Sequence, residues 1–118
     1  MRVMVLVKAS RSSEAGPTID PEAMARMGTF NEALREAGIF VEAAGLRPSC
    51  EGVRIGFDGD QRTVAAGPFL PADEQVAGYW IWEVEDMTQA IEWARRCPNP
   101  MPEPSQIEIR PFFEFDED

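Results

Sequence analysis

Residues 76–85 of the 118-residue chain read VAGYWIWEVE and carry bulky side chains on both faces of the β-strand that they predict. Successive side chains of a strand point to opposite faces, so a strand that is apolar throughout needs cover on both faces. Residues 2–8, RVMVLVK, show the same two-sided apolar pattern. We therefore expect these two strands to lie in the middle of one sheet.

The sequence predicts two helices. Asp20 and Pro21 suit a helix start, apolar residues follow at helical spacing, and Gly38 is placed to end a helix over 21–37. Asp86 suits a second start, and Pro98 ends that helix after Cys97. Ser10 to Thr18 predict a polar loop, Asp58-Gly59-Asp60 predicts a hairpin turn, and the remaining predicted strands are 39–46, 53–57, 62–66 and 106–111.

This order of elements predicts a ferredoxin-like split βαβ fold of the α+β class with an extra hairpin. We expect one domain over residues 1–112 and an acidic C-terminal tail over 113–118. Two helices can cover only one face of the sheet, and the other face would leave a large apolar patch in water. A second copy of the chain would bury that patch most simply, so we predict a homodimer with its sheets packed face to face.

Composition excludes several classes of function. The formal charge of −10 argues against nucleic acid and anionic membrane surfaces as partners. Apolar runs are too short for a signal peptide or membrane span, and Cys50 and Cys97 are far apart, so we expect reduced thiols and a cytoplasmic location. The chain contains no histidine, which removes His-dependent nucleophiles and most zinc sites. We expect no metal site and no cofactor.

Several short motifs, in their order along the whole chain, resemble those of the YCII-related proteins, and in particular the branch named for an Asp-Gly-Pro-Phe motif. They are Lys8-Ala9, Ser13-Glu14-Ala15-Gly16, Phe30-Asn31, Gly45-Leu46 with Pro48, Gly67-Pro68-Phe69 with Glu74, Ala77-Gly78, Ala90-Ile91-Glu92-Trp93 and Cys97-Pro98-Asn99-Pro100. The resemblance implies a bacterial, dimeric α+β barrel with a small-molecule cleft between sheet and helices.

Two departures from the family pattern bear on activity. Ala66 stands where the motif begins with Asp, and Arg47 stands where relatives often carry a His. A His and Asp pair is regarded as the catalytic feature of the wider family. The resemblance therefore implies a degenerate enzyme, and we assign no catalytic residues.

We predict a ligand-binding set near the Gly67-Pro68 turn, because loops on a rigid scaffold often carry function. Lys8 could bind an anionic group, while Arg47 and Glu74 could orient a polar ligand. Structural roles are the alternatives: a lysine at a strand end, an exposed ion pair, a turn, and aromatic side chains of the core or dimer interface. The predicted ligand-binding residues are Lys8, Glu14, Arg47, Phe69, Glu74, Tyr79 and Trp82.

Three functions stay open on the sequence alone. The first is a homodimer that binds a small molecule between sheet and helices. The alternative is a protein-interaction module in transcription, because relatives often accompany extracytoplasmic-function sigma factors; its dimer surface or acidic tail would contact the partner. The third is acid–base catalysis by Glu14, Glu74 or Glu83, which requires a buried carboxyl group beside a ligand-sized void.

Overall fold

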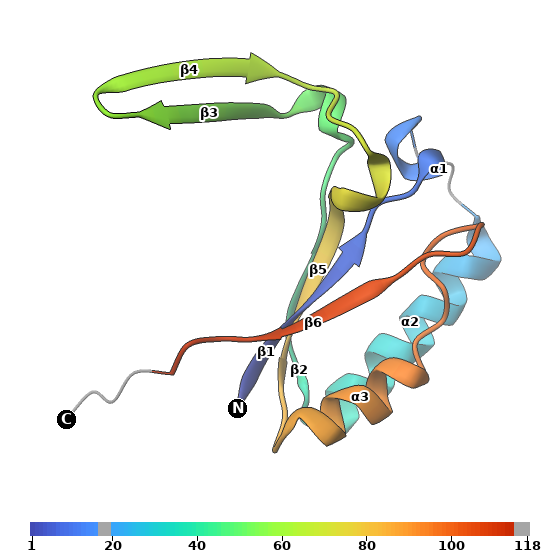
Figure 1. Cartoon of the computed structure of the whole chain (residues 1–118). Coiled ribbons are helices and arrows are strands. Elements are labelled where there is room, and N and C mark those ends of the chain that lie inside the picture. Colours follow the sequence, from blue (N-terminus) through green and yellow to red (C-terminus); the bar gives the residue numbers. More distant parts are fainter. Residues whose placement is uncertain (17–19, 115–118) are drawn as a thin grey trace.

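The computed structural model describes residues 1–16 and 20–114, and a four-stranded antiparallel sheet lies at its centre (Figure 1). The strand order is β2-β5-β1-β6. The bounds are Arg2–Lys8 for β1, Phe40–Gly45 for β2, Val76–Glu83 for β5 and Ile107–Pro111 for β6. The two strands with apolar side chains on both faces, β1 and β5, are the central pair, as the sequence predicted.

Two helices, α2 (Pro21–Glu36) and α3 (Met87–Arg95), cover one face of this sheet (Figure 1). Asp20 caps α2 by accepting a hydrogen bond from the Glu22 amide at 3.1 Å. Asp86 caps α3 by accepting from the Gln89 amide at 2.8 Å. Both predicted helix starts are confirmed, and the whole is a ferredoxin-like α+β fold.

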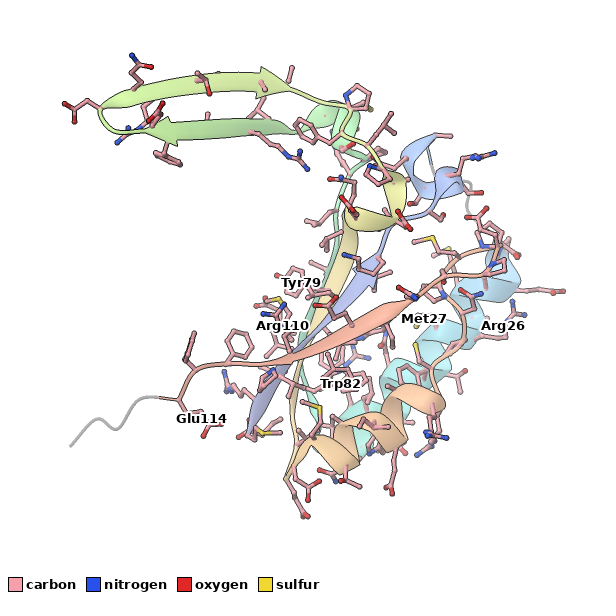
Figure 2. All side chains as sticks on the ribbon, in the orientation of Figure 1. Arg26, Met27, Tyr79, Trp82, Arg110 and Glu114 are labelled. Atoms are coloured by element: carbon pink, nitrogen blue, oxygen red, sulfur yellow. The ribbon has the colours of Figure 1, made fainter. Side chains whose placement is uncertain are left out.

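The core lies between the sheet and the helices. Val3 and Val5 of β1 and Trp80 and Trp82 of β5 point into it, and Phe30 of α2 packs its ring against both tryptophans, with ring centres 6.1 and 6.3 Å away. Such edge-on aromatic contacts add to the free energy gained from burying the rings. Trp82 is 0% exposed, and its side chain points to the helices in Figure 2.

The opposite face of the sheet has no helix over it (Figure 1). Four half-buried side chains form its apolar centre, Met4, Leu6, Tyr79 and Ile81, and we call this surface the open face. Tyr79 and Arg110 project on this side in Figure 2. Within the described residues the sheet does not close into a barrel. The dimeric barrel therefore stays a prediction that needs a second copy.

A β-hairpin projects from one end of the sheet, on the side of the open face (Figure 1). Its strands, β3 (Val53–Asp58) and β4 (Gln61–Ala66), pair with each other and form a separate two-stranded sheet. Gly59 has a positive φ of 58° in the turn, which the sequence predicted at this place. We call residues 53–66 the arm.

Three details differ from the sequence prediction. A short helix, α1 (Arg11–Glu14), replaces the start of the expected polar loop, because Ser10 and Ser13 form a reciprocal capping box. Strand β5 ends at Glu83 instead of Glu85, and α3 ends at Arg95 before Cys97. The end of the predicted loop and most of the predicted acidic tail, residues 115–118, lie outside the described residues.

Candidate functional site

A pocket of about 420 Å³ opens between α2 and the adjoining ends of β2 and β5. Its volume is in the range of small-molecule sites. None of the residues that line it carries a charge, and most are apolar. The lining residues are Val7, Met27, Asn31, Ala43, Ala44, Gly45, Ala77, Gly78, Tyr79, Trp80, Pro100 and Met101.

Asn31 supplies a fixed amide group to this pocket. Its Oδ1 accepts a hydrogen bond from the Trp80 indole Nε1 at 2.8 Å, which fixes the orientation of the amide because an indole N–H can only donate. The Asn31 Nδ2 has no hydrogen-bond partner among the groups that the structure describes. This nitrogen is therefore a donor available to a ligand.

Tyr79 also belongs to the lining, but its side chain projects on the open face, away from α2. Its hydroxyl donates to the Glu42 carboxylate at 2.7 Å. This hydrogen bond, together with partial desolvation and the negative charge of Glu42, raises the pKa of the Tyr79 phenol above 10.0. Tyr79 is consequently neutral at physiological pH and acts as a hydrogen-bonding group, not as a base.

The connector between α3 and β6 contributes Pro100 and Met101 to the pocket lining. Asn99 Oδ1 accepts from the Met101 amide at 2.9 Å and from the Ser105 hydroxyl at 2.6 Å. The buried Ser10 hydroxyl also lies 3.2 Å from the Met101 sulfur. These contacts hold Met101 in place although its segment has no regular secondary structure.

Gly78 allows β2 and β5 to approach each other closely beside the pocket. A Cβ atom at this position would lie 2.9 Å from the carbonyl oxygen of Ala44 on the neighbouring strand. Any side chain here would push β2 away from β5 and alter the pocket mouth.

A separate polar cluster joins the arm to the rest of the chain. The Glu14 carboxylate accepts from the Ser49 amide at 2.8 Å and from the Ser49 hydroxyl, and the same hydroxyl accepts from the Phe69 amide at 3.0 Å. A Cβ atom on Gly67 would overlap the Ser49 carbonyl oxygen. The Gly-Pro-Phe segment therefore packs tightly on the turn of residues 49–51, and Ser49 links three segments.

The seven predicted ligand-binding residues do not meet in one place. Tyr79 lines the pocket, whereas Trp82 lies in the core. Glu14 and Phe69 belong to the Ser49 cluster.

The four charged residues of the predicted set, Lys8, Glu14, Arg47 and Glu74, are absent from the pocket lining. Arg47 pairs with Glu51 at 3.0 Å, and the predicted joint contact of Arg47 and Glu74 with a ligand stays a prediction. Lys8 donates to the Glu74 backbone carbonyl at 3.4 Å.

Sequence reasoning missed Asn31, Met27 and Ser49 as residues of interest. Asn31 belongs to the Phe30-Asn31 pair, which contributed to the family resemblance, and that was the available signal. Met27 and Ser49 gave none, because a methionine in a helical stripe and a serine in a loop are ordinary residues until the fold brings their neighbours together.

Groups for acid–base or nucleophilic chemistry are not gathered at the pocket. Glu83 is half exposed and pairs with Arg2 at 3.5 Å on the open face, and Glu74 is exposed. Burial raises the pKa of the Cys97 thiol to about 11, so it is protonated and weakly nucleophilic at neutral pH.

Among residues 1–16 and 20–114, no three Cys, Asp or Glu side chains are grouped so that they could hold a metal ion. The same residues contain no helix long and apolar enough to cross a membrane.

The fold and the pocket define a class: a ferredoxin-like α+β domain with an uncharged cavity between its helices and its sheet. The sequence matches the YCII-related domain over residues 1–116, and the chain belongs to this family. It is also similar to uncharacterized protein R00369 of Rhizobium meliloti (strain 1021). The two are 25% identical over 92 residues, which cover 78% of this chain and 74% of the relative.

Proposed function

We propose that the protein is a homodimer that binds a small, uncharged molecule in the pocket between α2 and the sheet. The observation that carries the proposal is the Asn31 amide, whose oxygen is held by Trp80 while its nitrogen stays available. A ligand with a hydrogen-bond acceptor for Asn31 Nδ2 and an apolar part for Met27, Trp80 and Met101 fits this lining.

The absence of charge in the lining argues for binding and against acid–base catalysis. Tyr79 is the titratable residue of the lining, but its phenol projects on the open face, and its pKa is raised above 10.0. Arg47 and Ala66, the two positions at which the chain departs from the family's His and Asp, are both absent from the pocket lining. These facts support a degenerate enzyme that has kept a binding site.

The open face supports the dimer. Met4, Leu6, Tyr79 and Ile81 form an apolar surface on the central strands, and no helix covers it (Figure 1). Sheets that pack face to face bury such a surface at a spacing of about 10 Å.

Native mass spectrometry of freshly purified protein tests both parts. We expect a dimer mass with a discrete additional mass for a retained ligand. Ala43 is an exposed pocket residue, so Ala43→Phe should fill the cavity and abolish the additional mass while the dimer persists. Val41→Phe, on the same strand but outside the pocket lining, is the matched control and should retain it.

The outcomes separate cleanly. A bare dimer in every sample would contradict the ligand, and a bare monomer would contradict the dimer. Retention of the same mass by Ala43→Phe would show that the ligand binds elsewhere.

A further inference from the structure

The arm has one apolar face, and that face is exposed. Cross-strand pairing places Ile55 opposite Val64 and Val53 opposite Ala66, with Phe57 further toward the tip on the same side. The charged residue of this face, Arg62, lies opposite Phe57, with its guanidinium 4.7 Å from the centre of the Phe57 ring. The exposed fractions are 63% for Val53, 46% for Ile55, 73% for Phe57 and 72% for Val64. The other face carries Arg54, Thr63, Asp58 and Gln61. A hairpin of two strands is at most marginally stable in water by itself, so this apolar face needs cover.

Within residues 1–16 and 20–114, the body of the chain does not supply that cover. The side chain of the arm that reaches back to the body belongs to the polar face: Arg54 donates to Gln75 at 3.2 Å and lies over the Phe69 ring at 3.9 Å. Since side chains alternate across a strand, the face with Ile55 is turned away from those contacts. The described residues therefore leave this face open to a partner from another molecule.

The surface area of the chain points to a second copy. The accessible surface is 8479 Å², whereas a compact monomer of this mass exposes about 6,400 Å². The radius of gyration is 16.3 Å, against about 13.5 Å for a compact domain of this length. The surplus of about 2,000 Å² lies in the range that each subunit of an obligate dimer buries, about 1,000–2,500 Å².

The symmetry of the proposed dimer decides where the two arms lie. A two-fold axis parallel to the strands places β2 of one subunit beside β6 of the other. Both are edge strands of the four-stranded sheet, so each has one edge without a partner strand in the described pairing. Closing both unlike edges removes the unpaired backbone groups of the sheet. Under this symmetry both arms project over the same end of the dimer, each toward the other subunit (Figure 1).

An axis across the strands is less favourable for the arm. It would carry each arm to the far end of the partner's sheet, where the lining of a groove of about 530 Å³ combines apolar residues with three charged ones: Met1, Ile81, Phe112 and Phe113 with Arg2, Glu83 and Glu114. The arm would remove the three charged side chains from water, which costs free energy. The corresponding face of a second arm carries one charged side chain, Arg62, at its tip.

We propose that the arms of the two subunits pack against each other through the faces that carry Val53, Ile55, Phe57 and Val64, and so cover one end of the dimer. This inference rests on the homodimer proposed above. Ile55, at the middle of the face, lies nearest to its own copy, and Thr63, on the opposite face of the arm, lies far from its copy.

Cysteine cross-linking tests the arrangement. Ile55→Cys and Thr63→Cys are made separately in a Cys50→Ser background, because Cys50 is exposed and Cys97 is half-buried. Both variants are treated with a short bis-maleimide, and native mass spectrometry of the untreated samples reports the dimer. We expect a covalent dimer from Ile55→Cys and little or none from Thr63→Cys or the background alone, because packed sheets lie about 10 Å apart.

Each other outcome overturns the inference in its own way. A dimer in which neither cysteine cross-links, or in which both do so equally, contradicts arm packing while the proposed dimer holds. A monomer contradicts the proposed dimer itself, and the arm inference fails with it.

Discussion

The body and the arm both contain strands with an apolar face, but the two faces differ in burial. In β5, Trp82 is 0% exposed because α2 and α3 lie over its face of the sheet. In β3, Val53, Ile55 and Phe57 share one face, yet Phe57 is 73% exposed. Alternation therefore states which side chains share a face, and only the elements packed on that face decide whether it is buried. Where the chain supplies no covering element, the apolar face is a candidate interface.

The largest expected contrast comes from truncating one aromatic side chain in each region. Trp82→Ala leaves a cavity in a packed core and should lower the free energy of unfolding by about 3–5 kcal/mol. Phe57→Ala should change the stability of the isolated chain by less than about 0.5 kcal/mol, because its ring is mostly in water. Urea denaturation followed by tryptophan fluorescence measures both.

Protein concentration sharpens this comparison. In a dimer with packed arms, the unfolding midpoint of Phe57→Ala should fall below that of the wild type at high protein concentration, and the two should converge on dilution. Equal losses of stability for the two variants at low concentration would mean that the arm is part of the single-chain core.

The junction between the regions gives the next largest effect. A Cβ atom on Gly67 would overlap the Ser49 carbonyl oxygen, so Gly67→Ala must displace backbone and should destabilise the protein by about 3 kcal/mol. At Gly52, the nearest atom to a new Cβ is the same carbonyl oxygen at 3.4 Å, so Gly52→Ala is a milder control. Thermal unfolding compares the two, and a Gly67→Ala protein as stable as the control would contradict the tight packing at this junction.

Most of the fold could be predicted because its signals are local or depend on one face of one element. The two-sided apolar pattern of β1 and β5 identifies central strands, and Asp20 and Asp86 cap their helices through neighbouring amides. The capping box at Ser10 was missed because a helix of four residues has too little periodicity to detect.

The candidate site could not be predicted in the same way. Asn31 and Trp80 are 49 residues apart in sequence, and Asn31 becomes a ligand donor only because its oxygen meets the Trp80 indole. Arg47 and Glu74 were predicted to converge from their order along the chain, but in the structure Arg47 pairs with Glu51, four residues further along. Charged side chains with several nearby partners cannot be assigned by spacing.

Removing the Ser49 side chain, which links the arm to the body, should lower the free energy of unfolding by less than Gly67→Ala does. Ser49→Ala removes the hydroxyl that donates to Glu14 and accepts from Phe69. The loss should be about 1–2 kcal/mol, because water can reach part of this cluster and replace the lost hydrogen bonds. Hydrogen exchange should show faster opening of β3 and β4 with unchanged protection of β1 and β5. Ser105→Ala, in the connector near the pocket, is the control and should leave the arm's exchange rates unchanged.

The smallest expected effect concerns the open face, whose side chains are half-buried, between the buried core and the exposed arm. Tyr79 is the single tyrosine, so ultraviolet titration reports it alone. We expect its midpoint above 10.0 because of the Glu42 hydrogen bond, and Glu42→Gln should shift it down toward 10.0. The pKa is higher in the folded state, so this interaction stabilises the protein below pH 10.0 and is lost as the pH rises through the folded-state value. Glu36→Gln, on α2, should leave the midpoint unchanged. A wild-type midpoint at 10.0 that does not respond to Glu42→Gln would mean that the pair is open in solution.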